Sequence, residues 1–396
     1  MSGRPAAPPA LPDHLHVGCG AADRLVDLVE GHSATSGSRR PLVVMGSASS
    51  RTGWAKEVVA RLRRRHGWEL DVVVRRSHRL TVAEAERLVG AARPHSPDLV
   101  VGIGGGSVLD AAKVVAGLCR SSVTLARAVA QPSAMEHVVP LVAVPTTAGS
   151  GSEATPTATL WDGPGGAKLA LDDLRLAPRL AVVDPLLGLT LPLRSLASAA
   201  LDALAHGVES VWSTRSTAES RAHALHGVEL VSSGLLGCLA DPGDLSARSA
   251  LSLGAAHSGV AIGVTRTTLA HALSYPLTAR HGLSHGHACA LALAPVAAFN
   301  AAVAASDCVD PRGEEFVRSR VREVLTALGV ESSAGLRRLV EEVLGVVGLP
   351  TLDDVRPAVD LPAVVREAQA SGRSRNNPRR VDAAALLPLL QQCAQT

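Results

Sequence analysis

Residues 98–113 read Asp98-Leu-Val-Val-Gly-Ile-Gly-Gly-Gly-Ser-Val-Leu-Asp-Ala-Ala-Lys113, and this stretch decides the predicted fold. The run Asp98–Ile103 is short and apolar, which is typical of a buried strand, and Val108–Leu118 has the pattern of a helix. The glycines between them let backbone N–H groups approach a phosphate at the start of the helix, where the helix dipole favours negative charge. We expect Ser107 to cap that helix.

A strand before the glycines and a helix after them favour a phosphate cradle over a plain tight turn. The cradle is neither the usual Rossmann fingerprint nor a P-loop. A second candidate cradle, Pro145-Thr-Thr-Ala-Gly-Ser-Gly-Ser-Glu153, follows directly on a predicted strand at 140–144. Small hydroxyl residues and glycines at the carboxyl end of a strand suit the ligand crevice of an open α/β sheet. Alone this segment could be a flexible loop, but two such loops after neighbouring strands favour a dinucleotide.

Strand-like and helix-like segments alternate through the first half of the chain. Further strands are predicted at 41–46, 70–74 and 180–183, and helices at 53–65 and 81–93. This alternation implies a parallel sheet with helices on both faces. After Pro185 the chain turns to long segments rich in alanine and leucine, with a helical pattern. We therefore predict an α/β dinucleotide-binding domain over residues 1–185 and an all-helical metal-binding and substrate domain over residues 186–396.

The composition excludes several classes of protein. The net charge is only +3, and four Trp, one Tyr and two Phe are too few for a platform that stacks nucleic-acid bases. No apolar run reaches the roughly 18 residues that a membrane crossing needs, and Met1–Pro12 lacks the apolar core of a signal peptide. Six scattered cysteines without a C-x-x-C pair fit small buried side chains in a reducing cytoplasm. Three of the 39 lysine and arginine residues are lysines, so Lys113 and Lys168 are informative exceptions.

One aspartate and several histidines recur at metal-ligand spacing in the helical half. Asp202 and His206 stand four residues apart, so on a helix their side chains share one face. His271 and a group of histidines between 281 and 287 follow later in the chain. A single helical histidine is more often a hydrogen-bonded core residue, whereas this cluster favours a metal site. Three imidazoles and one carboxylate suit Zn²⁺ or Fe²⁺, and such an ion polarises a carbonyl oxygen that accepts a hydride from nicotinamide.

Together, these four motifs resemble the iron-containing (group III) alcohol dehydrogenase family, in order and spacing from about residue 16 to about residue 300. The family has an N-terminal dinucleotide-binding α/β domain and a C-terminal helical domain with the site in the cleft, and its members are often dimeric or larger. The resemblance implies four metal ligands: Asp202, His206, His271 and His285. It implies as cofactor-binding residues Gly104, Gly105, Gly106, Ser107, Asp110, Lys113, Thr146, Thr147, Ser150 and Lys168.

Two positions depart from the family pattern. Many members have a second histidine four residues after the third ligand, which relays protons, but this chain has Tyr275 there. A phenol can donate a proton through water, and Tyr275 and His281 are the candidate catalytic residues. Many NAD-preferring members carry an acidic residue just after the first strand, where this chain has Gly46-Ser47. Ser47 is then a candidate cofactor contact and Arg51 could hold a 2′-phosphate, so we expect NADPH to be accepted as well as NADH.

Two segments, 209–221 and 265–278, look like the phosphonoacetaldehyde reductase branch of that family. Those enzymes reduce phosphonoacetaldehyde to 2-hydroxyethylphosphonate in pathways to phosphonate natural products, including antibiotics. Arg266 and Arg280 flank the third ligand and could clamp a doubly charged phosphonate, with salt bridges as the alternative for both.

We therefore expect a cytoplasmic oxidoreductase for a small anionic aldehyde, with a homodimer as its candidate assembly and without a nucleic-acid or membrane partner. Three alternatives stay open at this point. They are a general alcohol dehydrogenase, a maleylacetate-type reductase, and a lyase like dehydroquinate synthase, which binds NAD and metal without net redox change.

Overall fold

The computed structural model describes residues 8–64, 71–75, 79–163 and 166–392. Arg65 at the end of the predicted helix 53–65, Leu70 at the start of the predicted strand 70–74, and Cys393 lie outside the described residues. The chain forms two compact units. The first unit is Asp13–Thr190, and the second contains residues 191–392 together with residues 8–12, as far as the structure describes them. The observed division follows Thr190, five residues after the predicted boundary at residue 185.

The first unit is built on a six-stranded sheet whose paired strands all run parallel. The strand order is β1-β8-β5-β4-β2-β3, so β4 and β5, which precede the two candidate cradles, are neighbours in the middle of the sheet. The strands are β1 (Leu15–Val17), β2 (Pro41–Gly46), β3 (Asp71–Arg75), β4 (Leu99–Gly104), β5 (Leu141–Pro145) and β8 (Leu180–Val183). The predicted parallel α/β sheet is confirmed.

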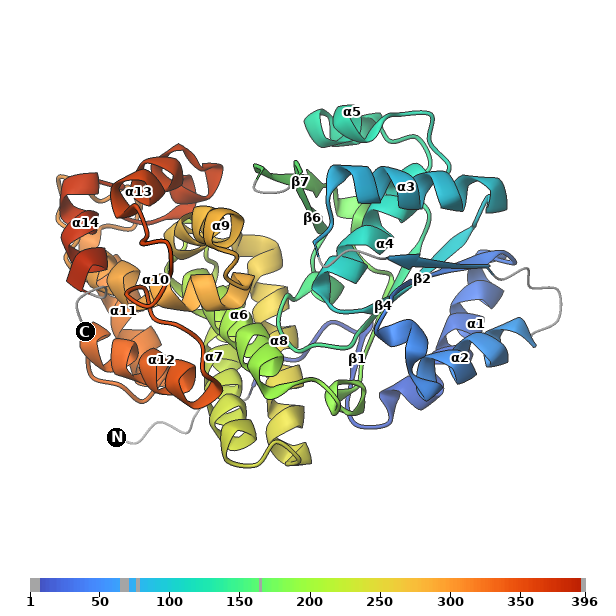
Figure 1. The fold of residues 1–396 in the computed structure, drawn as a ribbon, viewed down its shortest axis with the longest axis horizontal. Helices are drawn as coiled ribbons and strands as arrows, with labels where there is room; N and C mark the ends of the chain where they lie inside the picture. The colour runs from blue at the N-terminus through green and yellow to red at the C-terminus, as the bar shows by residue number, and fades with distance from the viewer. Residues whose placement is uncertain (1–7, 65–70, 76–78, 164–165, 393–396) are drawn as a thin grey trace. The chain divides into compact units, whose positions relative to one another are not determined.

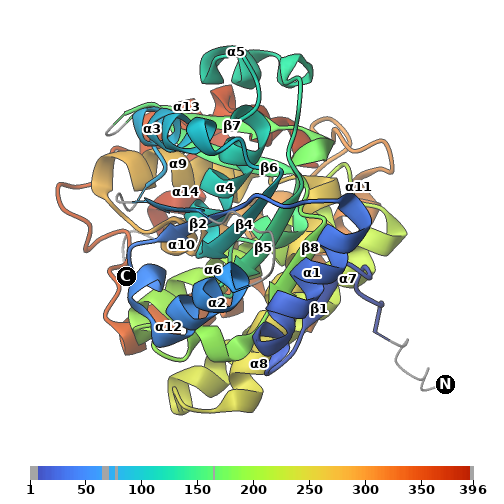
Figure 2. The ribbon, with the colours of Figure 1, turned by 90° about the vertical axis from the view of Figure 1, so that its right-hand side faces the viewer.

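Helices cover both faces of this sheet, which is why its central strands are apolar without alternation. Leu42 and Val100 face the core that α3 and α4 share, whereas Val43 and Val101 face the core of α1 and α2. Figures 1 and 2 show the two helix layers on opposite sides of the sheet. The helices of the unit are α1 (Leu25–Ser36), α2 (Gly53–Arg63), α3 (Val82–Ala92), α4 (Gly106–Leu118) and α5 (Leu125–Ala130).

An antiparallel hairpin of β6 (Thr157–Trp161) and β7 (Lys168–Asp172) was not predicted. Its apolar side chains, among them Leu160 and Leu171, join the core on the α4 side of the sheet. The Asp162-Gly163 turn signal next to an alternating run could have identified it. The hairpin matters for the site because it places backbone polar groups beside α4.

The second unit is helical, as predicted. Its helices are α6 (Leu193–Trp212), α7 (Ala218–Ala240), α8 (Leu245–Thr265), α9 (Leu269–His281), α10 (His285–Ala301), α11 (Glu314–Ala327), α12 (Ser333–Val347), α13 (Leu361–Ala370) and α14 (Ala383–Gln392). Helix α6 packs against α7, α8 and α10, and α9 packs against α10. Within the described ranges, no helix combines the length and the apolar character that crossing a bilayer requires.

Candidate active site

The glycine-rich stretch forms the turn between β4 and α4 at the carboxyl end of the sheet. Strand β4 ends at Gly104 and α4 begins at Gly106, with Gly105 as an extended N-cap that makes no side-chain bond to the helix. The prediction that Ser107 caps the helix is therefore wrong, because the helix starts two residues earlier than expected and Ser107 lies in its first turn. Gly105 offers no side-chain oxygen at the start of α4, and the positive end of a helix dipole at such a turn favours the negative charge of a phosphate.

The two candidate cradles pack against each other. Thr146 donates its backbone N–H to the last residue of β4 at 3.0 Å. A Cβ atom placed on Gly106 would lie 2.5 Å from Cβ of Ser150, and one on Gly105 would lie 3.3 Å from Oγ1 of Thr147. Glycine is therefore needed at position 106 for the loops to meet. The structure brings the predicted cofactor residues of both loops together at one edge of the sheet.

A buried polar network lies beside the cradles. The hydroxyl of Ser152 donates to Oδ1 of Asp110 (2.7 Å) and accepts from Nζ of Lys113 (2.8 Å). Asp110 also accepts from the N–H of Thr159 (3.2 Å), and Lys113 donates to the carbonyl of Thr157 (2.9 Å). Burial raises the pKa of Asp110, although Lys113 opposes the rise. These two side chains join α4 to the second loop and the hairpin, and their contacts with a cofactor stay predictions.

The remaining candidate cofactor residues lie around the same edge of the first unit. Ser47 is exposed directly after β2, the strand next to β4. Lys168 opens β7 opposite Trp161, near enough to the buried Asp110 to counteract part of the pKa rise that burial causes. Burial raises the pKa of Glu153 in the second loop to about 7, so its carboxyl group is partly protonated near neutral pH.

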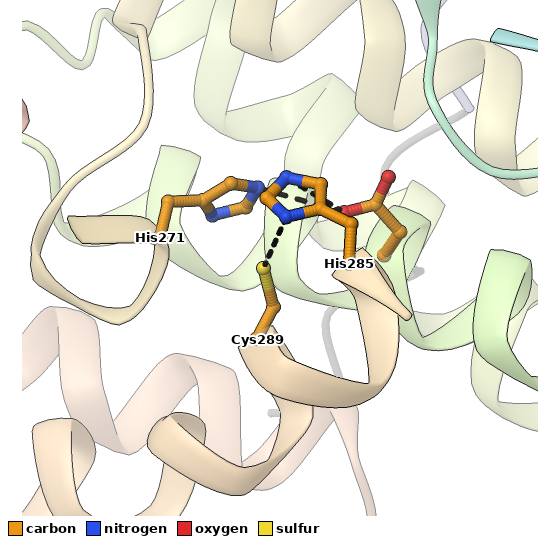
Figure 3. Close-up of side chains that lie close together, drawn as sticks. His271, His285 and Cys289 are labelled. Atoms are coloured by element: carbon orange, nitrogen blue, oxygen red, sulfur yellow. Dashed lines mark hydrogen bonds and ion pairs between the residues drawn. The ribbon is translucent and has the colours of Figure 1, made fainter. Parts of the chain in front are cut away.

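In the second unit, three helices bring the four predicted metal ligands together. Helix α6 carries Asp202 and His206 one turn apart, α9 carries His271, and α10 begins with His285. The Nε2 atoms of these histidines lie 3.9, 3.6 and 3.8 Å from Oδ1 of Asp202, in the order 206, 271, 285. Figure 3 shows the rings of His271 and His285 pointing toward one another from their separate helices.

The chemistry of these residues fits a divalent cation. Oδ1 of Asp202 and Nε2 of His271 are buried and make no hydrogen bond within the described residues. Burial would raise the pKa of Asp202, but the imidazoles around it hold this pKa well below its ordinary value. A buried carboxylate oxygen and a buried imidazole nitrogen without partners are costly unless something binds them. Iron(II) or zinc(II) would satisfy both atoms, and both ions accept these ligand types.

Glu209 is a candidate functional residue that we did not predict. It lies on α6 and is fully buried, and its carboxylate pairs with Nδ1 of His271. It also accepts from the hydroxyl of Thr268 (2.6 Å) and the N–H of Ala270 (2.7 Å). With Nδ1 held in this way, Nε2 of His271 is directed to Asp202. The spacing of residues 202, 206 and 209, which share one helix face, was the available signal.

Replacing Glu209 by glutamine is expected to lower the affinity for zinc or iron by about 10- to 100-fold, because the carboxylate that orients His271 and raises its basicity is lost. The measurement is a titration of the metal against a chelator. Glu229→Gln is the matched control, since this exposed carboxylate also faces a histidine, His226, at 3.9 Å. Equal metal affinities for wild type and Glu209→Gln would contradict the assigned role.

The two candidate catalytic residues are both on α9. The ring of Tyr275 stacks on that of His285, with centroids 6.0 Å apart and planes inclined by 22°. Tyr275 therefore lies beside a candidate ligand, where the family pattern has its relay histidine. His281 is the last residue of α9, and its Nδ1 is buried without a hydrogen-bond partner in the part of the chain that the structure describes. Their catalytic roles stay predictions.

The two candidate substrate arginines differ in their surroundings. Arg280 forms an ion pair with Glu367 of α13, and both side chains are close to half exposed. The structure thus gives Arg280 the salt bridge that the sequence analysis named as the alternative to a phosphonate clamp. Arg266 follows the last turn of α8 and adopts φ 59° and ψ 167°, a conformation that is essentially restricted to glycine.

Comparisons with known proteins agree with this geometry. Residues 12–185 match the family described as "Iron-containing alcohol dehydrogenase", and residues 196–393 match "Fe-containing alcohol dehydrogenase family, C-terminal". The chain is 44% identical over 302 residues to phosphonoacetaldehyde reductase of Streptomyces viridochromogenes, which covers 74% of this chain and 75% of that protein. It is 31% identical over 279 residues to an alcohol dehydrogenase of Thermococcus barophilus, covering 68% and 69% of the two chains.

Among solved structures, the chain is similar to sulfoacetaldehyde reductase from Bifidobacterium kashiwanohense in complex with NAD⁺. The TM-score is 0.82 at 27% sequence identity, and the match covers 98% of each chain. These matches span both units, and the family-specific match decides against the lyase alternative. The chain therefore belongs to the iron-containing alcohol dehydrogenase family, in its phosphonoacetaldehyde reductase branch, and is an NAD(P)-dependent alcohol dehydrogenase that works as an aldehyde reductase.

Proposed function

We propose that this enzyme reduces phosphonoacetaldehyde to 2-hydroxyethylphosphonate in phosphonate biosynthesis, with NADPH or NADH and with Fe²⁺ or Zn²⁺ held by Asp202, His206, His271 and His285. The observation that carries the metal dependence is the convergence of three imidazoles on a buried carboxylate oxygen that has no hydrogen-bond partner among the described residues. When bound, a divalent ion polarises an aldehyde carbonyl and stabilises the negative charge that a hydride from NAD(P)H creates on its oxygen.

The chain's own residues supply orientation and a proton. Asp202 contributes the negative charge that a divalent ion needs, and Glu209 fixes the tautomer of His271. Reduction consumes one hydride and one proton, and the hydroxyl group of Tyr275 is our candidate donor of that proton, directly or through water. Its position against His285 supports this role. The first helical amides of α4 and the two loops around them would hold the cofactor's phosphates.

Arg266 is our candidate for recognition of the phosphonate. The junction between α8 and α9 that carries it is fastened to α6: the hydroxyl of Thr268 donates to Glu209 (2.6 Å) and accepts from Nε1 of Trp212 (3.1 Å). A non-glycine residue in the backbone conformation of Arg266 costs about 1–3 kcal/mol, and such strain clusters at ligand-binding sites. Two relatives support an anionic substrate, since their names give a phosphonate and a sulfonate aldehyde.

We expect Arg266→Ala and Arg266→Gly to lose the preference for phosphonoacetaldehyde over propanal to the same extent, by about 100-fold in kcat/KM, which is about 2.7 kcal/mol. Both variants lack the guanidinium, but glycine relieves the backbone strain. Arg266→Gly should therefore be more stable than Arg266→Ala by about 1 kcal/mol. Denaturant unfolding measures the stabilities, and Arg280→Ala is the control. An unchanged substrate preference in both Arg266 variants would exclude the clamp.

The substrate assignment is tested by following NADPH and NADH absorbance with phosphonoacetaldehyde, propanal and lactaldehyde, after loading the enzyme with Fe²⁺ or Zn²⁺. A kcat/KM at least about 100-fold higher for the phosphonate supports the proposal. Equal values for all three aldehydes would leave a general aldehyde reductase.

A further inference from the structure

The metal-ligand group in the second unit contains a cysteine that the established ligand pattern does not include. Cys289 lies on α10, one turn after His285, and its side chain is fully buried. Its Sγ and one ligand atom each of Asp202, His271 and His285 all lie within 4.8 Å of one another. Figure 3 shows the sulfur directed toward the ring of His285, whose Nδ1 is 4.0 Å away.

Two buried polar atoms of this group, 3.6 Å apart, indicate a position for a ligand. Oδ1 of Asp202 and Nε2 of His271 are both buried and form no hydrogen bond with any described residue. The side chain of His271 is 1% exposed, so water does not readily compensate for the missing partner. The thiol of Cys289 therefore shares its surroundings with two polar atoms that need a cation, rather than with apolar side chains alone.

The other buried cysteines do not share these surroundings. Cys119 packs in the apolar core that α4 forms against the sheet, and Cys238 lies on α7. In the described part of the chain, Cys289 is the cysteine found in a group of potential metal ligands. The sequence-based interpretation of the cysteines as small buried hydrophobic residues thus suits Cys119 and does not explain Cys289.

We propose that Cys289 is a ligand of the metal centre through its thiolate, next to Asp202, His271 and His285. His206 is not in the group whose ligand atoms all lie within 4.8 Å of one another, so the thiolate competes with it for the fourth protein position and leaves a position for the aldehyde oxygen. The thiol loses its proton to water when the metal binds, because only the thiolate ligates. Sulfur ligands favour Zn²⁺ over harder ions. This inference rests on the proposed metal dependence and adds the donor that biases the choice of metal toward zinc.

The test replaces the native ion by Co²⁺ in the full-length enzyme and records the absorption spectrum at one equivalent of cobalt. We expect a thiolate-to-cobalt charge-transfer band in the near ultraviolet for wild type, together with the visible bands of the bound ion. Cys289→Ser should still bind cobalt but should lose the charge-transfer band. Cys19→Ser and Cys238→Ser, which alter an exposed and a buried cysteine, should keep it.

Competition between Zn²⁺ and Fe²⁺ provides the second measurement, and Cys289→Ser should lose about tenfold or more of the zinc preference. Bound cobalt without the charge-transfer band in wild type would overturn the ligation by Cys289 and leave the proposed function intact. Failure of wild type to bind cobalt or any other divalent ion would overturn both proposals. Since the band is measured first in wild type, a folding defect of Cys289→Ser does not prevent a decision.

Discussion

Replacing Asp202 by asparagine is expected to remove stoichiometric metal and to lower kcat/KM by at least about 10³-fold, which corresponds to about 4 kcal/mol of transition-state stabilisation. Asparagine keeps the size of the side chain but removes the negative charge on which three imidazoles converge. Its amide group would also bring donor hydrogens toward a position that requires lone pairs. Metal analysis of the purified variant and steady-state kinetics with NADPH and NADH measure the two effects.

The matched control is Asp184→Asn. Asp184 is also a buried aspartate, but it accepts hydrogen bonds from the N–H groups of Ala22 and Leu186 at 3.0 Å each and lies in the first unit. It should lose stability and keep the metal. If Asp202→Asn retains one equivalent of metal with wild-type affinity, Asp202 is not a ligand, and the assignment of the metal centre fails.

Gly286→Ala should destabilise the enzyme by about 3 kcal/mol or more and weaken metal binding at least about tenfold. Gly286 follows His285 at the start of α10. A Cβ atom there would overlap the carbonyl oxygen of Ser198 and lie 2.7 Å from the backbone N of Asp202. Because both contacts are backbone atoms of α6, the overlap can be relieved only by separating α10 from α6, which moves His285 away from Asp202.

Unfolding in denaturant and a metal titration measure these two effects, and Gly345→Ala is the control. Gly345 lies on the exposed side of α12, with nothing within 4 Å of an added Cβ atom. There alanine should be neutral or stabilise the protein by up to about 1 kcal/mol, because it favours the helix. Wild-type stability of Gly286→Ala would show that α6 and α10 do not depend on this close approach.

The sequence predicted those parts of the fold that depend on local pattern. Strands 41–46 and 180–183 have the predicted bounds, because buried strands in a parallel sheet are continuous apolar runs. The hairpin of β6 and β7 was missed because its strands are not continuous apolar runs: β6 contains two threonines, and β7 (Lys168–Asp172) begins and ends with charged residues. The start of α4 was misplaced because glycines reveal neither helix nor turn by themselves.

In the site, the sequence predicted residue types and spacing but not side-chain partners. Asp202 and His206 were candidates because an aspartate and a histidine on one helix face are an informative pattern, and the family resemblance added His271 and His285. The structure brings the four together, and their role as ligands stays a prediction. Glu209 and Cys289 were not predicted, because the sequence does not show which residues of other helices lie next to their side chains. The ion pair of Arg280 with Glu367 joins residues 87 positions apart, and a local sequence pattern cannot predict a pair that distant in the chain.

The hydrogen bonds of the buried Lys113, beside the two candidate cradles, explain why this position holds a lysine in a chain rich in arginine. Arginine accounts for nearly all of the basic residues, yet Lys113 is a lysine and has no exposed surface. Its Nζ donates to Ser152 (2.8 Å), Thr155 (3.3 Å) and Thr157 (2.9 Å), so three tetrahedrally arranged hydrogens meet three oxygens. A guanidinium is planar, larger and carries five donors, and it would leave some of them without acceptors. An arginine at position 113 would therefore break the link between α4, the second loop and the hairpin, so lysine suits this position in a chain whose basic residues are mostly arginines.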